Sequence, residues 1–458
     1  MKKIFLILSV LVIIGMALAA CQAATATQAP ATEAPPAATE APAATEAPAA
    51  TEAPTAAVSG SVRIGSWDSA DALQPFNDAI ASFEAAHPGV NIELESVPQG
   101  YGDKLLAEFA SGTAPDVFQV GDGDVPKFAA LGALEPLDPY ISGEKGTEPL
   151  DTSIFVQAVA DIGKVNGTTY LLTKDFSPLV LYYNKKAFDA AGVAYPTNDW
   201  TWDDLLTAAQ ALTVKDSSGN ITQWGIQLPD GWGDVYWSRG IWPIIYQNGG
   251  DVISADGKTT TGYLNSDATV QAVQWYSDLF LKEKVAPTKA DIDALAGADL
   301  FATGKAAMLW TGIWPLADYI KNTDIAVGTV QLPQNVERGN SICWAGFAMY
   351  SKSQNKDAAW AFLRWIGADE GAKEFAKTAL TDVKPIADEQ GKTADKYYGS
   401  VMADLDNVHP LPDFSNPKFG ECVITPFQAA LEGYFTNGGD LKTILTDLAT
   451  QADACLAK

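Results

Sequence analysis

The segment DVFQVGDGDVPKFAALGAL, residues 116–134, carries the clearest signal of the fold. It begins with a short apolar run, passes through an acidic, glycine-rich loop, and continues with apolar residues at helical spacing. This order predicts a buried strand, a loop and a helix. Units of this kind build α/β proteins, in which ligands gather at the carboxyl ends of the strands.

The residues before this stretch repeat the same pattern twice. Strands are predicted in SVRIGSWDS (61–69) and VNIELESVPQG (90–100), and amphipathic helices in LQPFNDAIASFEAAHPG (73–89) and YGDKLLAEFASGTAPD (101–116). Alternation at this spacing predicts a parallel sheet with helices on both faces.

Four candidate ligand contacts follow the predicted strands: Trp67, Asp68, Asp122 and Asp124. An aspartate in a glycine-rich loop is also a common turn residue, so each position alone is a weak signal. Because the carboxyl ends of parallel strands meet at one edge, we expect the tryptophan and the aspartates to converge there. Their convergence favours a ligand contact over a purely structural role.

A second stretch, GKAAMLWTGIWPL (304–316), places two tryptophans four residues apart. A strand is predicted up to Gly312, and Pro315 suits the first turn of a following helix. Trp314 then lies on the strand-to-helix turn, where side chains reach a ligand. The alternative is that Trp310 and Trp314 are both core residues.

The N-terminus predicts export. Two lysines precede an apolar run at residues 4–18 that is short for a membrane span. The run ends in LAAC (18–21), which resembles the bacterial lipobox and implies a signal peptide over 1–20, cleavage before Cys21 and lipidation of that cysteine. The alternative is a plain signal peptide with an incidental cysteine. We expect a protein anchored to a membrane rather than spanning it.

Residues 21–57 are dominated by repeats of ATEAP. A tract of Ala, Thr, Glu and Pro without large apolar side chains cannot offset the entropy of ordering, so we expect a disordered tether. Fully extended at roughly 3.1 Å per residue, such a tether would reach on the order of 100 Å from the bilayer.

Composition excludes several classes of protein. The formal charge of −26 and the absence of a clustered Lys/Arg face argue against nucleic acid as a partner, and against adhesion to anionic lipid. The only histidines, His87 and His409, each precede a proline, and no HExxH, CxxC, Walker or GxGxxG motif is present. We therefore expect no metal, no cofactor and no Ser-His-Asp triad.

Besides Cys21, the chain has Cys343, Cys422 and Cys455, an odd number that predicts one bridge and one thiol. Helices are predicted at 423–435 and 441–458, with a turn between them. Cys422 and Cys455 lie at matching distances from this turn, so an antiparallel hairpin would bring them together. Cys343 would then be a buried, inert thiol.

Five ordered motifs resemble the bacterial family 1 extracellular solute-binding proteins, the maltose and multiple-sugar type that serves ABC importers. They are PDVFQVGDGDVPKFAALGALEPLDPY (115–140), LVLYYNKKAFDAAGVAYPTNDWTWDDLLTAAQALT (179–213), YQNGGDVIS (246–254), FATGKAAMLWTGIW (301–314) and SKSQNKDAAWAFLRWI (351–366). The resemblance implies a type II periplasmic-binding-protein-like fold, with two interleaved α/β lobes joined by a hinge. Lobe one would hold residues 58–174 and 344–394, and lobe two residues 175–343 and 395–458.

The resemblance also implies a ligand cleft between the lobes, in which Trp314 stacks on the ligand. The positions carried over are Trp67, Asp68, Asp122, Asp124, Asp175, Ser177, Trp237, Arg239, Trp314, Trp344 and Glu421. Relatives often carry glycine where this chain has Trp344, so that indole either fills a subsite or packs the hinge. Indole rings cover the C–H faces of a pyranose, and carboxylates accept hydrogen bonds from its hydroxyls.

These features predict a monomeric, extracytoplasmic, lipid-anchored binding protein that captures a sugar or oligosaccharide and delivers it to an ABC permease. It would not be an enzyme. One alternative is a surface glycoside hydrolase, which needs a pair of carboxylates in one cleft. Another is a binder of a polyamine or other cation, held by the acidic residues and cation–π contacts. Glycerol phosphate is less expected, because the sequence places little basic charge near the proposed cleft.

Overall fold

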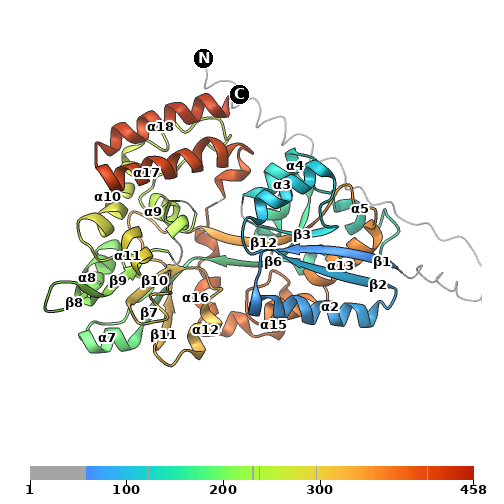
Figure 1. Cartoon of the computed structure of the whole chain (residues 1–458), viewed down its shortest axis with the longest axis horizontal. Coiled ribbons are helices and arrows are strands. Elements are labelled where there is room, and N and C mark those ends of the chain that lie inside the picture. The colour runs from blue at the N-terminus through green and yellow to red at the C-terminus, as the bar shows by residue number, and fades with distance from the viewer. Residues whose placement is uncertain (1–57, 122, 230–231, 237, 296, 410) are drawn as a thin grey trace, which may run out of the picture. The chain divides into compact units, whose positions relative to one another are not determined.

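Two larger mixed β-sheets, each covered by helices, organise the described residues (Figure 1). The structure is a computed structural model that describes residues 58–458 except 122, 230–231, 237, 296 and 410. The predicted signal peptide, Cys21 and the tether lie outside the described residues, as do Asp122 and Trp237. The two sheets with their helices form the two α/β lobes, here called the first and second lobes.

The first sheet is built from β1 (Gly60–Ser66), β2 (Val90–Ser96), β3 (Val117–Gly121), β6 (Leu171–Pro178) and β12 (Ile342–Met349), in the order β2-β1-β3-β12-β6. Strands β1, β2 and β3 are parallel, as predicted, because a helix returns the chain after each strand. β12 runs antiparallel to both β3 and β6, so the prediction of an all-parallel sheet is wrong for β12, whereas β6 keeps the direction of β1–β3. Figure 1 shows β6 and β12 side by side.

The second sheet is built from β7 (Val180–Asn184), β8 (Val214–Lys215), β9 (Ile221–Gln227), β10 (Ala306–Thr311) and β11 (Val327–Val330), in the order β11-β7-β10-β9-β8. Only β9 and β10 pair in parallel, while β7 pairs antiparallel with β10 and β11. A short hairpin, β4 (Lys164–Val165) and β5 (Thr168–Thr169), lies outside both sheets.

Helices bury both faces of the central strands. Every residue of β10 and of β12 is buried, which is the pattern of strands covered on both sides. The helices of the first lobe are α2 (Gln74–Ala86), α3 (Tyr101–Ser111), α4 (Asp124–Ala130), α5 (Asp138–Ile141), α6 (Gln157–Ala160), α13 (Lys356–Gly367), α14 (Ala372–Ala376) and α15 (Lys384–Glu389). Those that follow β7 in the chain and accompany the second sheet are α7 (Lys185–Ala191), α8 (Trp202–Leu212), α9 (Ile241–Gln247), α10 (Asp267–Leu281), α11 (Lys289–Ala294), α12 (Leu316–Lys321), α16 (Tyr398–Met402), α17 (Thr425–Asn437) and α18 (Leu441–Leu456). Within the described residues, no helix is long and apolar enough to cross a bilayer.

The side chain of Asn340 forms hydrogen bonds to the segments that connect the two sheets. Its side chain is fully buried, accepts a hydrogen bond from the Leu179 N–H (3.2 Å) and donates one to the Leu179 carbonyl (2.9 Å). Leu179 separates β6 from β7, and Asn340 lies just before β12. The Asn340 amide also donates to the carboxylate of Asp404, on a third connecting segment. One buried amide therefore ties three connections together.

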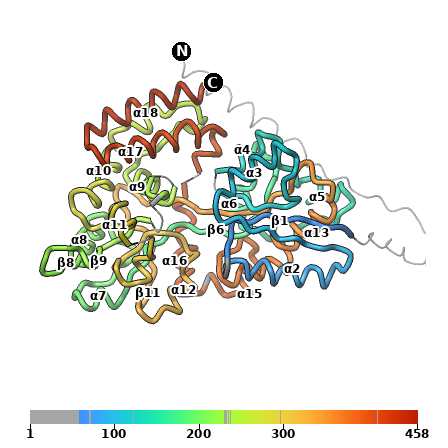
Figure 2. The backbone as a smooth tube through the Cα atoms, viewed as in Figure 1, coloured from blue at the N-terminus to red at the C-terminus, as the bar shows by residue number. Residues whose placement is uncertain are grey.

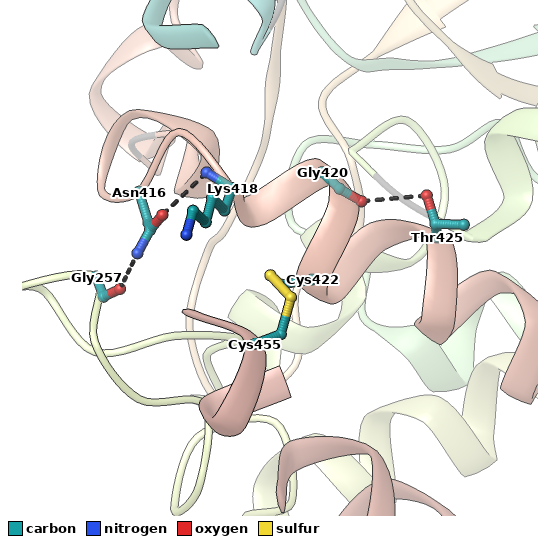
Figure 3. The surroundings of a disulfide bond; sticks show 7 residues. All are labelled: Gly257, Asn416, Lys418, Gly420, Cys422, Thr425 and Cys455. Atoms are coloured by element: carbon teal, nitrogen blue, oxygen red, sulfur yellow. Dashed lines mark hydrogen bonds between the residues drawn. A yellow bond between two sulfur atoms is a disulfide. The ribbon is translucent and has the colours of Figure 1, made fainter. Parts of the chain in front are cut away.

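A disulfide closes the C-terminal helical hairpin. Cys422 and Cys455 are bonded, with their Cα atoms 5.5 Å apart, which is the pairing the sequence predicts (Figure 3). Helix α17 begins at Thr425, two residues later than expected, because Gly420–Ile424 form a π-helical turn that carries Cys422. Figure 2 shows the two C-terminal helices beside α10. Cys343 is buried and takes no part in a disulfide.

Asp382, between α14 and α15, is a carboxylic acid placed almost wholly inside the first lobe, with 1% of its surface exposed. Burial raises its pKa to about 7, although the nearby Thr173 hydroxyl partly offsets this effect. The unfolded chain should titrate near the ordinary aspartate value of about 3.9. Between these values the unfolded state has released its proton while the folded state still holds one, so stability falls as the pH rises.

We therefore expect Asp382→Asn to raise the free energy of unfolding by about 1–3 kcal/mol at pH 8, and to change it little at pH 4.5. Urea unfolding of both proteins at the two pH values measures this difference. An equal effect of the substitution at both pH values would contradict the prediction.

Candidate ligand-binding site

A cavity of about 1400 Å³ opens between the two sheets, at the carboxyl ends of β1 and β3. Both lobes contribute to its walls. Of the residues predicted from the sequence, those that line it are Trp67, Asp68, Asp124, Asp175, Ser177, Arg239, Trp314, Trp344 and Glu421. The structure therefore brings together every predicted contact that lies within the described residues.

Trp67 follows β1, and its indole lies against the backbone at the end of β3. A Cβ atom at Gly121 would lie 3.1 Å from the Trp67 ring, so glycine at this position lets the ring approach. The indole and the Tyr101 ring pack in a T-shaped arrangement, with ring centroids 5.6 Å apart and planes at 82°. These contacts fix one aromatic surface at the first-lobe wall of the cavity.

The acidic floor of the cavity is organised by a cation that the sequence analysis missed. Lys174 Nζ lies 3.0 Å from Asp68 Oδ2 and 3.0 Å from Asp175 Oδ2. Burial by itself lowers the pKa of Lys174, but the charges of Asp175 and Asp68 outweigh it and raise the pKa above its ordinary value. The lysine is therefore charged and shared by two carboxylates.

A β-bulge explains why Lys174 was missed. Side chains alternate between the faces of a strand, so Lys174 and its neighbour Asp175 should point to opposite faces. In β6, however, Asp175 pairs with Ala345 and Thr173 pairs with Gly346, which leaves Lys174 as the extra residue. Bulges re-aim side chains in this way next to functional sites. The alternating pattern of a regular strand cannot predict that a residue such as Lys174 lies at a bulge.

Trp314 lies on the turn between β10 and α12, as predicted, and 39% of its surface is exposed. Its ring rests on Gly312, where a Cβ atom would collide with it, so that position requires glycine. The guanidinium carbon of Arg239 lies 5.0 Å from the centroid of the ring. Trp310, on β10, is fully buried and belongs to the core.

Ser177 holds the turn that carries Trp314. Its Oγ accepts a hydrogen bond from the Ile313 N–H (2.8 Å) and donates one to the Pro178 carbonyl (2.7 Å). The hydroxyl proton is thus committed to the protein. Although Ser177 lines the cavity, this geometry gives it a positioning role.

Trp344 lies on β12 with 3% of its surface exposed, and its ring lies close to Gly346. The sequence left two roles open for this residue, a ligand subsite or packing at the hinge. Its deep burial in the core favours packing. Little of its surface is accessible from the cavity.

The remaining charged groups ring the cavity. Asp124 is half-exposed, yet desolvation by the walls raises its pKa despite the ammonium of Lys127 at 3.6 Å. Glu421 is exposed on the π-helical turn. Asp413, which the sequence analysis did not select, lies directly against Gly123 at the start of α4. Asp413 follows no strand of either sheet, so the rule that ligand contacts lie after strand ends could not predict it.

The cavity carries more basic charge than the sequence analysis expected. Lys127, Lys174 and Arg239 all line it, so the statement that little basic charge lies near the cleft is wrong. Each of these cations has an acidic or aromatic neighbour: Asp124, the Asp68–Asp175 pair and Trp314, respectively. Within the part of the chain that the structure describes, no cluster of His, Cys, Asp or Glu side chains could hold a metal ion.

Residues 66–373 match the sequence model of a family described as bacterial extracellular solute-binding proteins. The chain belongs to this family. The resemblance drawn from the five sequence motifs is confirmed.

Relatives of this solute-binding protein are themselves named as binding proteins. The maltotriose-binding protein of Pyrococcus abyssi is 26% identical over 318 residues, which cover 68% of this chain and 63% of that protein. The sn-glycerol-3-phosphate-binding periplasmic protein of Brucella melitensis is 29% identical over 307 residues, which cover 64% of this chain and 67% of that protein.

The fold is shared with solved solute-binding proteins. The ABC substrate-binding protein Lmo0181 from Listeria monocytogenes, solved in complex with cycloalternan, matches with a TM-score of 0.74 and 26% identity, covering 87% of this chain and 99% of that one. The predicted fold class, type II with two α/β lobes, is confirmed.

Proposed function

We propose that this solute-binding protein captures an uncharged sugar or oligosaccharide in the cavity and delivers it to an ABC permease. The observation that carries the proposal is the partly exposed indole of Trp314, which lines the same cavity as the Asp68–Lys174–Asp175 cluster. Two similar proteins support it, since one is named as a maltotriose-binding protein and the other was solved in complex with cycloalternan.

The chemistry of these groups suits a pyranose. A rigid indole covers a face of C–H groups and gains hydrophobic burial at a small cost in side-chain entropy. Carboxylate oxygens accept hydrogen bonds from hydroxyls, and charge-assisted bonds are the stronger kind. Trp67 and Trp314 provide aromatic surfaces from the two lobes, and Asp68 and Asp175 provide the acceptors.

A phosphate-bearing ligand is the second candidate, favoured by the relative named for sn-glycerol 3-phosphate and by the three cations that line the cavity. We favour the sugar because the cations are already engaged. Lys174 is held by two carboxylates, and Lys127 lies beside Asp124. A phosphate would need these carboxylates to move away, since like charges repel at such distances.

Titration of the purified protein with uncharged oligosaccharides tests the proposal. Maltotriose, cellotriose, xylotriose and mannotriose form the test panel, with sn-glycerol 3-phosphate and spermidine as charged competitors. We expect at least one glycan to bind with a stoichiometry of one and to be recovered intact. Turnover of a labelled glycan would support a hydrolase instead, and binding of only a charged competitor would overturn the sugar assignment.

The two lobes are proposed to close around the ligand. The ranges expected from the sequence are 58–174 with 344–394 for lobe one and 175–343 with 395–458 for lobe two. Because β6 reaches Pro178 and β12 begins at Ile342, both in the first sheet, we place the crossings at Leu179 and Asn340. Contacts from both walls are fully made only when the walls approach, so a ligand should shift the population toward the closed state. The connections tied by Asn340 lie at these crossings and would serve as the hinge.

Closure predicts a smaller radius of gyration when the ligand is bound. Small-angle X-ray scattering with and without the binding glycan measures this change. Equal compactness in the two states would contradict closure without affecting the assignment of the binding site.

The anchoring arrangement remains our proposal from the sequence. Cleavage before Cys21, lipidation of that residue and a tether over 21–57 would hold a monomeric protein at the extracytoplasmic face of the membrane. The tether would let the folded part reach a permease in the same membrane.

A further inference from the structure

The bulged residue of β6 is a feature that the binding of a sugar alone does not require. Lys174 has no partner in β12, and the bulge turns it toward the cavity beside Asp175. Its side chain is only 11% exposed, so the ammonium lies at the base of the site.

The surroundings of Lys174 hold it in one position. Its ammonium is 3.0 Å from an oxygen of each aspartate and 5.8 Å from the ring centroids of both Phe76 and Phe375. The ammonium is stabilised by cation–π attraction to the two rings and by charge-assisted hydrogen bonds to the two carboxylates. The Gln119 amide also donates to Asp68 Oδ2, at 3.4 Å.

Within the described residues, side-chain contacts to the two carboxylates reach their Oδ2 atoms. Lys174 contacts Oδ2 of both aspartates, and the Gln119 amide and the Ser66 hydroxyl donate to Oδ2 of Asp68. The Oδ1 oxygens of both aspartates therefore remain as acceptors for a ligand. The two carboxylates lie on either side of one ammonium, 3.0 Å from an oxygen of each, so a single ligand can reach both.

We propose that Lys174 determines the specificity of this cavity for uncharged ligands by occupying the cation site between Asp68 and Asp175. Two adjacent hydroxyls of a sugar can donate to the two remaining oxygens without adding charge. A polyamine would have to displace an ammonium that is already seated between the aspartates. A phosphate would face two carboxylates that only one cation compensates. This inference rests on the proposed function and names the residue that selects the class of ligand.

The test compares Lys174→Met and Lys174→Gln with wild type, in calorimetric titrations against the four glycans and against spermidine. A matched control is Lys104→Met, because Lys104 also lies between two carboxylates, Glu95 and Glu108, but does not line the cavity. Lys174→Gln removes the charge while retaining hydrogen-bonding atoms, so it also serves if the methionine variant fails to fold. Melting curves establish that each variant is folded.

We expect both substitutions at position 174 to weaken glycan binding by about tenfold or more, since unscreened carboxylates then repel each other and lose their alignment. The same variants should bind spermidine at least about tenfold more tightly than wild type, because the vacated cation site accepts an ammonium. Lys174→Arg should continue to exclude spermidine. A merely structural role for Lys174 predicts weaker glycan binding without any gain in spermidine binding.

The inference is overturned if the folded variants bind spermidine no better than wild type, or if Lys104→Met produces the same gain. Equal spermidine affinity of wild type and variants would mean that Lys174 does not block the cation site. If wild type binds none of the glycans, the proposed function fails, but the spermidine comparison still decides whether Lys174 excludes cations.

Discussion

Replacing Trp314 by alanine is expected to weaken the binding of an uncharged oligosaccharide by about 30- to 100-fold, or about 2–3 kcal/mol. The indole lines the cavity with 39% of its surface exposed, rests on Gly312 and lies beside Arg239. A ligand that stacks on this ring would lose most of its apolar contact with the second lobe. Isothermal titration calorimetry with the glycan that binds wild type measures the change.

Two controls separate stacking from general damage. Trp314→Phe keeps an aromatic face and should retain part of the affinity. Trp275, which stacks on Trp202 with ring centroids 4.2 Å apart, lies outside the cavity, so Trp275→Ala should leave glycan affinity within about twofold of wild type. If Trp314→Ala binds the glycan as tightly as wild type, the ligand does not stack on this indole.

Removing the Cys422–Cys455 disulfide is expected to lower the free energy of unfolding by about 3–4 kcal/mol, since the bond closes a loop with a sequence separation of 33. The double variant Cys422→Ser/Cys455→Ser, unfolded in urea beside wild type, measures this loss. Cys422 lies on the same π-helical turn as Glu421, which lines the cavity, so the bond also fastens part of the ligand site to α18.

The reductant supplies the control for this prediction. Dithiothreitol should lower the stability of wild type to that of the double variant, and should leave the double variant unchanged. Equal stability of wild type and the double variant in oxidising buffer would show that the hairpin does not depend on the bond.

The fold could be predicted from sequence wherever local patterns decide it. The strand–loop–helix order at 116–134 predicts β3 and α4, and the same alternation predicts the two preceding strands and helices. The direction of β12 could not be predicted, because it depends on how a strand far along the chain returns to the first sheet. Pairing between distant strands leaves no local periodicity.

The site was predictable to the extent that strand ends and family motifs reveal it. Trp67 and Asp68 follow β1 directly, Asp124 begins α4 just after β3, and Trp314 lies beyond Gly312, which follows the last residue of β10. Lys174 could not be predicted, because a bulge in β6 breaks the regular alternation of side chains between the faces of the strand.

Asp413 was missed for a different reason. It reaches the cavity from a short 3-10 helix, Pro412–Phe414, that lies far along the chain from Gly123, against which it packs. Contacts of this kind depend on tertiary structure alone.

We propose that an indole from each lobe and the carboxylates of Asp68 and Asp175, which follow or lie on strands of the first sheet, meet around an uncharged sugar. A crystal structure of the protein with the binding oligosaccharide tests this arrangement. We expect a sugar ring against the indole of Trp314, with adjacent hydroxyls within hydrogen-bonding distance of Asp68 and Asp175. A glycan bound elsewhere, or one that leaves Trp314 and both aspartates without contact, would contradict it.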